Sequence, residues 1–419
     1  MCLRDRNKNE IENTKSKRSK IIGLSLIFFG FVIYLFFGLG IEGQATFRLS
    51  RPTDPFALPN LILPAHSFIG VSALLIAFFG GRIIMKAPKN FTIFIALSFF
   101  LAIAAFLVWA TAGKSFSLTG MLQATVVRAV PIALAAMAGI MCERVAVINI
   151  GIEGMLLAGA FAGALFGSIF GNLIGLVLAI LVGGGFGFIL AALVVTFRVD
   201  QIIAGVAINI FVLGITSFLT SHLLKSNPEL NDAQIFKSID IPFFSEIPVL
   251  GSVFFKHNIF VYFSIFIVIV STYYLFKTAY GLRARAVGEH PKAAETLGIS
   301  VIRTRFNHVI IGGMIAGFGG AWFTLGSVGR FDEGMTGGRG FIGLAAMIFG
   351  RWHPIGALFA ALVFGFADSL QQKLAILRTP IPSEFLAMAP YLVTIIVVAG
   401  IVGNAKPPQA IGKAYVKEN

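Results

Sequence analysis

Charged residues are scarce in this chain of 419 residues, of which 12% are charged and 57% are hydrophobic. The mean hydropathy is +0.88. Because soluble domains carry about 25% charged residues, this composition excludes a soluble protein. Apolar runs of about 20 residues recur, which is the length that crosses a bilayer as a helix, whereas the short alternating segments of a membrane barrel are missing. The sequence therefore predicts an all-α, polytopic integral membrane protein that contacts the lipid bilayer.

Cysteine is nearly absent, since only Cys2 and Cys142 occur, far apart and without neighbouring ligand residues. This excludes a disulfide framework and a cysteine-based metal site, and we predict no metal site of another kind. Acidic residues are also few: 19 Asp and Glu stand against 33 Lys and Arg, for a net charge of +14. The basic residues lie between apolar spans and not on one face. They therefore indicate orientation in a membrane, and we predict no nucleic-acid partner.

Catalytic motifs are missing as well. The stretch Gly113-Lys114-Ser115 resembles the end of a phosphate-binding loop, but Val108 stands where the first glycine is needed. No HExxH motif, GxSxG motif or pair of intramembrane carboxylates occurs, so we predict no catalytic residues, no enzyme and no bound cofactor. Ion-driven carriers need chains of ionisable residues in their spans. The ionisable residues within the spans of this chain are few, namely Arg128, Glu143, Arg144, Glu153 and Asp368. The energy source is therefore expected on another subunit.

The distribution of apolar runs divides the chain into a basic tail at 1–20, additional N-terminal spans within 21–112, a core at 118–402 and a tail at 403–419. The segment Arg351-Trp352-His353-Pro354 interrupts one apolar run, which gives about 11–12 transmembrane or broken helices. With both termini cytoplasmic, Lys and Arg number 21 on the cytoplasmic side and 10 outside, as the positive-inside rule requires. The predicted spans are 21–41, 61–80, 91–112, 121–141, 146–170, 173–197, 202–224, 258–276, 306–325, 341–370 and 385–402.

Two glycine-rich helix starts, Gly151-Ile-Glu-Gly154 and Gly337-Gly-Arg-Gly340, are weakly similar in sequence. On the predicted topology the two helices enter from opposite sides of the membrane, which suggests an inverted repeat of the kind that transporters use. The same glycines also occur wherever membrane helices pack closely. Both interpretations remain open.

The longest charged run between two apolar segments is 278–305, which the topology places in the cytoplasm. Pro291 is suited to the first helical position and Gly298 to the end, so a short helix parallel to the membrane is predicted. Such a loop either fits a soluble partner or is a solvated connector, and the spacing favours neither. The residues offered to a partner are Arg283, Arg285, His290, Pro291, Ala293, Ala294 and Gly298.

Polar residues within the spans suggest a substrate pathway. Asn149 and Glu153 lie among glycines that could open the backbone to a polar solute; alternatively, Glu153 stabilises a helix N-terminus by about 0.3–1 kcal/mol. Gln201 and Asn209 lie eight residues apart, near one helical face. They either line the pathway or form hydrogen bonds between helices.

Four stretches, in the same order, carry a resemblance to a known family. They are 131–161 with CERVAVINIGIEGM, 198–219, the external 247–255, and 281–371 with GLRARAVGEHPKAAETLGI and EGMTGGRGFIGLAAMIFGRWHP. The chain resembles the permease subunits of ABC importers for nucleosides and simple sugars, in the branched-chain amino acid, ribose and nucleoside permease superfamily. The resemblance covers about 118–402 and leaves the first three spans unmatched. His290 and His353 stand where the family often has Asn.

The resemblance implies import of a nucleoside or simple sugar across the bacterial cytoplasmic membrane. It also implies three partners: an ABC ATPase on the cytoplasmic face, a second homologous permease, and an extracytoplasmic substrate-binding protein. The short helix in 278–305 would then couple the permease to the ATPase. The alternative is an ATP-independent carrier or channel for a small polar solute.

Overall fold

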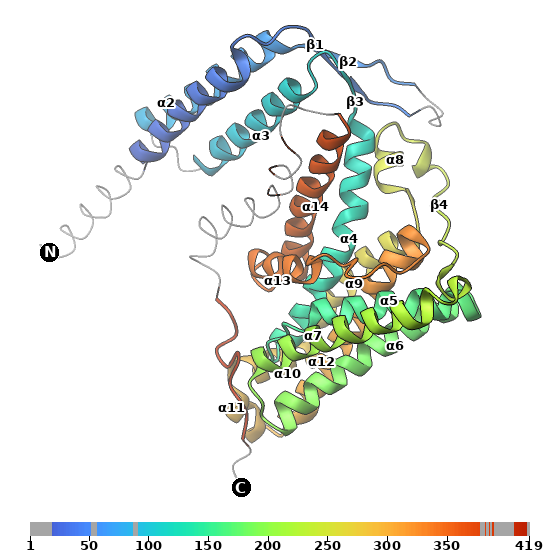
Figure 1. Ribbon diagram of the computed structural model, residues 1–419. Helices are drawn as coiled ribbons and strands as arrows, with labels where there is room; N and C mark the ends of the chain where they lie inside the picture. Colours follow the sequence, from blue (N-terminus) through green and yellow to red (C-terminus); the bar gives the residue numbers. More distant parts are fainter. Residues whose placement is uncertain are drawn as a thin grey trace, which may run out of the picture. The chain divides into compact units, whose positions relative to one another are not determined.

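The computed structural model describes residues 19–51, 57–86, 91–377 and 406–416, with residues 382, 385 and 388 besides (Figure 1). Within these residues, ten helices are long and apolar enough to cross a membrane, and one apolar helix, Arg339–Phe349, is shorter. The all-α membrane fold is thus confirmed. The predicted span 385–402, apart from residues 385 and 388, lies outside the described residues, as do residues 1–18 of the predicted N-terminal tail, whereas residues 406–416 of the predicted C-terminal tail are described. The chain forms two compact units, Met1–Gly120 with Leu374–Ile381, and Met121–Lys373 with Pro382–Asn419.

The first unit joins three membrane helices to a small sheet. In the sheet β1 pairs with β2 in antiparallel and with β3 in parallel. The predicted second span begins at Ala65 instead of residue 61, because the preceding four residues pair with β1 as a strand. The elements are the helix Ser19–Gly38, which ends in the π-helical turn η1 (Tyr34–Gly38), then β1 (Gln44–Arg48), β2 (Leu61–Pro64), α2 (Ala65–Lys86), α3 (Phe91–Ala110) and β3 (Ser115–Ser117).

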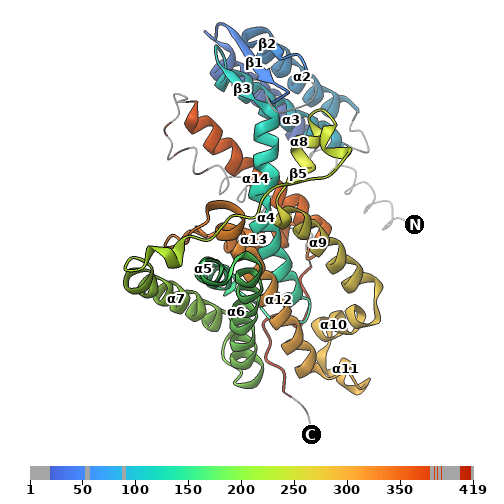
Figure 2. The ribbon, with the colours of Figure 1, turned by 90° about the vertical axis from the view of Figure 1, so that its right-hand side faces the viewer.

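The second unit is a helical bundle in which α5, α6 and α12 pack most extensively, as Figure 2 shows. Its helices are α4 (Leu118–Glu143), α5 (Ile152–Phe170), α6 (Asn172–Ala191), α7 (Gln201–Leu219), α8 (Leu250–Phe254), α9 (Ile259–Lys277), α10 (Ala279–Glu289), α11 (Pro291–Thr296), α12 (Val301–Phe323), α13 (Arg339–Phe349) and α14 (Pro354–Ile376). Its short elements are η2 (Ala192–Thr196), η3 (Thr220–Leu224), η4 (Pro228–Asn231), β4 (Ile239–Asp240), η5 (Phe244–Glu246), β5 (Lys256–His257) and η6 (Thr324–Val328).

Glycines allow the backbones of these three central helices to touch. A Cβ atom at Gly183 of α6 would lie 2.4 Å from the carbonyl oxygen of Gly313 in α12. A Cβ atom at Gly159 of α5 would lie 2.5 Å from the carbonyl oxygen of Gly317. Small residues hold membrane helices together by close packing, so this glycine contact is the structural centre of the unit.

We therefore expect Gly183→Ala to destabilise the protein by about 1–3 kcal/mol, because the added methyl group overpacks the contact with α12. Gly185→Ala is the matched control, since nothing lies within 4 Å of a Cβ atom there. Both changes carry the same gain in helix propensity, so the difference between them reports packing alone. Thermal unfolding of the two purified variants checks this, and equal melting temperatures would contradict the assigned contact.

The same succession of elements occurs twice in this unit. Long helix α4 leads through the irregular segment 144–151 into α5 and α6, and long helix α12 leads through η6 and an irregular stretch into α13 and α14. The two glycine-rich helix starts meet, because a Cβ atom at Gly340 would lie 2.7 Å from the Cα atom of Glu153. This close approach fits both interpretations of the glycine-rich starts, an inverted repeat and the close packing of small residues.

Three further predicted spans differ in detail from the structure, and one of them, 306–325, begins five residues earlier, at Val301. The predicted helix 146–170 begins only at Ile152, because 144–151 is irregular. The predicted interruption at Arg351-Trp352-His353-Pro354 is confirmed as the turn between α13 and α14, although only α13 is short.

Candidate functional site

The junction of α5 and α13 is organised by Glu153, in the first turn of α5. Its carboxylate accepts hydrogen bonds from the hydroxyl of Thr336 at 2.6 Å, from the backbone N–H of Gly338 at 2.8 Å and from that of Gly340 at 2.6 Å. The first N–H groups of a helix have no partner inside the helix and carry partial positive charge. Glu153 therefore stabilises a helix N-terminus, as one of the two sequence interpretations holds: its hydrogen bonds go to the start of α13, and its charge also lies in the first turn of its own helix.

Glycine is needed where the chain approaches this carboxylate. Gly337 and Gly338, which precede α13, have φ angles of +55° and +79°. These angles lie in the left-handed region that residues with a Cβ atom rarely adopt. The glycine-rich sequence thus lets the backbone turn so that its N–H groups point at Glu153.

The irregular segment before α5 is held by two amide side chains of α7. The Gln201 carbonyl accepts from the N–H of Ile148 at 2.7 Å. Asn209 accepts from the N–H of Gly154 at 2.7 Å and donates to the carbonyl of Ile150 at 3.0 Å. Both residues lie on one face of the helix, as their spacing predicts. They replace the backbone hydrogen bonds that 144–151 would make as a helix, which explains why α5 begins late.

Asn149, the remaining predicted pathway residue, is completely buried. Its amide nitrogen lies 3.5 Å from the sulfur of Cys142 and 3.6 Å from that of Met155. Its carbonyl oxygen is buried and has no hydrogen-bond partner among the described residues. A buried acceptor left without a donor costs about 1–3 kcal/mol. Asn149 therefore retains the capacity to accept a hydrogen bond.

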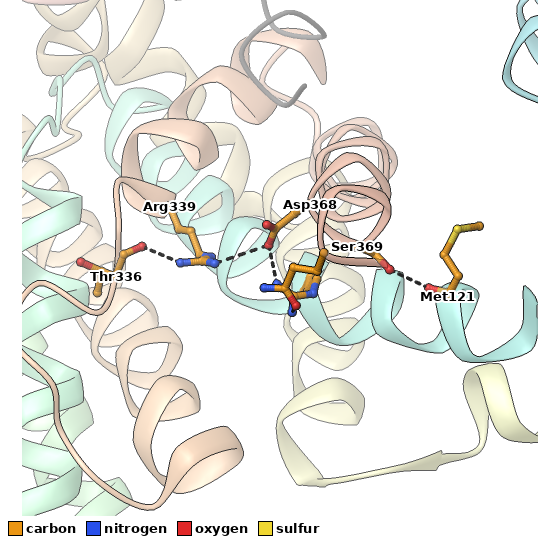
Figure 3. Close-up of polar contacts among 7 residues, drawn as sticks. Met121, Thr336, Arg339, Asp368 and Ser369 are labelled. Atoms are coloured by element: carbon orange, nitrogen blue, oxygen red, sulfur yellow. Dashed lines mark hydrogen bonds and ion pairs between the residues drawn. The ribbon is translucent and has the colours of Figure 1, made fainter. Parts of the chain in front are cut away.

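A charge network lies beside this junction. Asp368 of α14 accepts from Arg128 of α4 at 2.8 Å. It also accepts from Arg339 of α13 at 3.4 Å (Figure 3). Arg128 also contacts the side chain of Gln372. The three charged side chains are only 18–24% exposed, and two guanidinium groups share one carboxylate. Thr336 joins the network to the junction, because its carbonyl accepts from Arg339 at 3.2 Å.

At the opposite end of α4, polar contacts fix the turn between α13 and α14. The indole N–H of Trp352 donates to Glu143 at 2.6 Å, and Arg144 donates to the carbonyl of Trp352 at 2.7 and 3.0 Å. His353 stacks on Phe276, with ring centroids 4.7 Å apart. Burial, together with the charge of Arg144, lowers the pKa of His353, which favours the neutral imidazole in this stack.

Residues 278–300 of the predicted loop fold into α10 and α11, with His290 between them, so the predicted short helix is confirmed, whereas residues 301–305 form the first turn of α12. Gly298 has a φ angle of +79°, which suits its place just after the helix. Ala293 is exposed, whereas Ala294 is 2% exposed and packs in the chain's own core. The methyl group of Ala294 is thus not offered to a partner.

The remaining residues predicted for this surface also divide into exposed ones and ones that contact the chain itself. The Arg285 guanidinium lies over the ring of Phe276, 5.2 Å from its centroid. Arg283 and His290 are exposed, and Pro291 is partly buried. The exposed part of the predicted surface therefore consists of Arg283, His290, Ala293 and Gly298.

Residues 406–416, which belong to the predicted C-terminal tail, lie along the same helices. The N–H of Ala410 donates to the carbonyl of Gly288 at 3.1 Å, and the N–H of Gly412 donates to that of Ala146 at 3.3 Å. The hydroxyl of Tyr415 contacts the Glu295 carboxylate. The segment therefore connects the loop 278–305 to the irregular stretch before α5. No spacing rule could identify it, because its bonds are made mainly by the backbone.

Comparison with known proteins defines the class to which this architecture belongs. Residues 121–401 match the family described as branched-chain amino acid transport system, permease component. The chain belongs to this family, which confirms the resemblance seen in the sequence. It is a multi-pass membrane protein of the transport-permease class. No solved structure gives a significant match.

Among its relatives is the guanosine ABC transporter permease protein NupQ of Bacillus subtilis (strain 168), which is 41% identical over 307 residues, covering 70% of this chain and 95% of the relative. The nucleoside ABC transporter permease protein NupC of Lactococcus lactis is 36% identical, over 68% of this chain and 93% of the relative. The putative glucose ABC transporter permease protein TsgC13 of Haloferax volcanii is 30% identical, over 71% of this chain and 98% of the relative.

Proposed function

We propose that this chain is the membrane-spanning permease subunit of an ATP-driven importer for nucleosides. The observation that carries the proposal is its 41% and 36% identity to permeases named for guanosine and nucleosides, over nearly their whole length. The chain itself makes and breaks no covalent bond. ATP hydrolysis takes place on a separate ABC ATPase, and a second homologous permease and an extracytoplasmic binding protein complete the assembly. The N- and C-termini face the cytoplasm.

The junction between α5 and α13 is suited to such transport. Two helices that start side by side can separate as rigid parts, and alternating access in transporters with inverted repeats uses such motion. Glu153 bonds to the start of α13, and Asp368 bonds to Arg339 of α13. When α5 and α13 move apart, these hydrogen bonds and this ion pair must either be kept or be exchanged for others. Asn149 has a free acceptor oxygen, which could receive an N–H or O–H donor of a nucleoside. Gln201 and Asn209 act on substrate only indirectly, since they hold the backbone of the junction.

An uptake assay in cells tests the substrate class. A strain that expresses the complete importer, and lacks other nucleoside uptake, is given labelled guanosine with an excess of one unlabelled competitor. We expect purine and pyrimidine nucleosides to compete, and glucose, ribose and branched-chain amino acids not to. The sugar alternative has its own support in the 30% identity to a putative glucose permease. Competition by glucose alone would establish it in place of nucleoside import.

The exposed face of α11 is the surface that we assign to the ATPase. We expect Ala293→Glu to leave the amount of folded permease unchanged and to reduce nucleoside-stimulated ATP hydrolysis at least tenfold, because a buried unpaired charge costs several kcal/mol at an interface. Ala293→Ser is the control, because it adds only a small uncharged group at the same position, and it should keep ATP hydrolysis near the wild-type level. Both variants are measured by ATPase activity and by co-purification of the ATPase.

Ala294→Glu is expected to behave differently. Because Ala294 lies in the core of the permease itself, its replacement should reduce the amount of folded protein before any effect on coupling. Wild-type coupling in Ala293→Glu, measured at equal expression, would show that α10 and α11 only connect two spans.

A further inference from the structure

A pocket of about 520 Å³ lies beside α10, away from the junction of α5 and α13. Its wall is formed by the end of α9, by α10, by the residues that follow α11 and by the first turns of α12, all of which lie together in Figure 2. Its polar side includes Arg283, Ser300, Arg303 and Asn307, and its apolar side includes Tyr274 and Ile311.

Positive charge in this pocket is not neutralised by the chain itself. Arg283 and Arg303 are both exposed, and no Asp or Glu belongs to the lining. Within the described ranges no carboxylate forms an ion pair with either guanidinium. The two carboxylates of the loop have other hydrogen-bond partners: Glu289 accepts from the backbone N–H of Gln409, and Glu295 contacts Tyr415. The pocket is therefore suited to an anion.

The depth of the pocket indicates what kind of anion it takes. On α12 the lining runs from Arg303 to Ile311, which is about 12 Å along a helix that is apolar enough to cross a membrane. Tyr274 lies within the last turn of α9, and its hydroxyl meets the ring nitrogen of His308 at 3.1 Å. Leu297, which also lines the pocket, is 80% exposed. A basic group near the start of α12, Arg303, with apolar Ile311 about two turns further along the same helix, matches an amphiphile and not a free ion.

We propose that this pocket binds the headgroup phosphate of an anionic phospholipid, from the leaflet on the side of α10 and α11. Two guanidinium groups hold a phosphate through several charge-assisted hydrogen bonds, and Ser300 and Asn307 add donors. Basic pockets between membrane helices commonly receive such headgroups. The acyl chains would extend from the headgroup past Tyr274 and Ile311, along the membrane-spanning parts of α9 and α12. Bound lipid would join α10 to the start of α12 and so stabilise the loop.

The test uses the full-length permease, purified in detergent and stripped of lipid. Bound lipid is measured by native mass spectrometry with added phosphatidylglycerol, with phosphatidylcholine as the zwitterionic lipid and glycerol phosphate as the free headgroup. We expect Arg283→Gln with Arg303→Gln to weaken phosphatidylglycerol binding at least tenfold. Arg198→Gln removes an exposed arginine outside the pocket and should bind as the wild type does. If the double variant does not fold, the single variant Arg303→Gln replaces it in the test. We expect this single variant to bind phosphatidylglycerol at least threefold more weakly than the wild type.

The outcomes separate the lipid from other occupants. Selective binding of phosphatidylglycerol that is lost in the pocket variants supports the proposal. Undiminished phosphatidylglycerol binding in those variants overturns it, as does glycerol phosphate binding as tightly as the lipid. If the variants keep the lipid but lose co-purification of an ATPase subunit, the pocket is a protein contact and the proposal is wrong.

Discussion

Glu153→Gln is expected to reduce nucleoside uptake about 10- to 100-fold. The two oxygens of Glu153 accept from three donors, and hydrogen bonds to a charged group each contribute about 1.5–3 kcal/mol. A glutamine amide has one acceptor oxygen, so its NH₂ group must face a backbone N–H group or the Thr336 hydroxyl. The substitution also removes the negative charge at the N-termini of both α5 and α13, where the helix dipoles favour an anion.

The matched control is Glu229→Gln, which removes an exposed carboxylate outside the junction. Uptake is measured at equal amounts of folded permease in the membrane, so that a loss of protein is not read as a loss of transport. Uptake by Glu153→Gln equal to that of Glu229→Gln would show that the bond between the two helix starts is dispensable.

Loss of the carboxylate of Asp368 is expected to have the largest effect on stability. In Asp368→Asn the guanidinium groups of Arg128 and Arg339 face each other without a counter-charge. Breaking a largely buried pair in this way costs about 2–4 kcal/mol when some solvent reaches it. Arg128→Gln leaves one neutral pair between Asp368 and Arg339, so we expect a much smaller loss.

Thermal unfolding of the two purified variants measures this difference. The double variant Arg128→Gln with Asp368→Asn should recover part of the loss, because one of the two unpaired cations is gone. If Arg128→Gln proves as destabilising as Asp368→Asn, the network is held by geometry alone and not by its charge balance.

The sequence predicts which segments cross the membrane much better than it predicts which residues meet. Proline and glycine positions correctly predict α11, and the polar interruption of an apolar run correctly predicts the turn at Arg351-Trp352-His353-Pro354. Strand pairing of Leu61–Pro64 overrides the apolar run that suggests a longer α2. In this first unit, hydropathy alone does not distinguish a short strand from the start of a span.

The sequence also does not predict which residues far apart along the chain contact each other. Glu153 bonds to residues about 185 positions further along the chain, and Arg128 bonds to Asp368, 240 positions away. A charged residue within a span stands out in the sequence, but its type does not predict which residue it bonds to. The short helix α11 shows the same limit on a smaller scale. Within six residues no periodicity separates the exposed Ala293 from the buried Ala294.

The most direct test of the proposed function is uptake by the reconstituted importer. Proteoliposomes that contain this permease, its partner permease and the ABC ATPase are given the binding protein loaded with labelled guanosine, with ATP or a non-hydrolysable analogue on the ATPase side. We predict accumulation against a gradient with ATP, none with the analogue, and none with ATP when this chain is omitted. Equal accumulation with ATP and with the analogue would contradict an ATP-driven permease and would favour a carrier or channel that works alone.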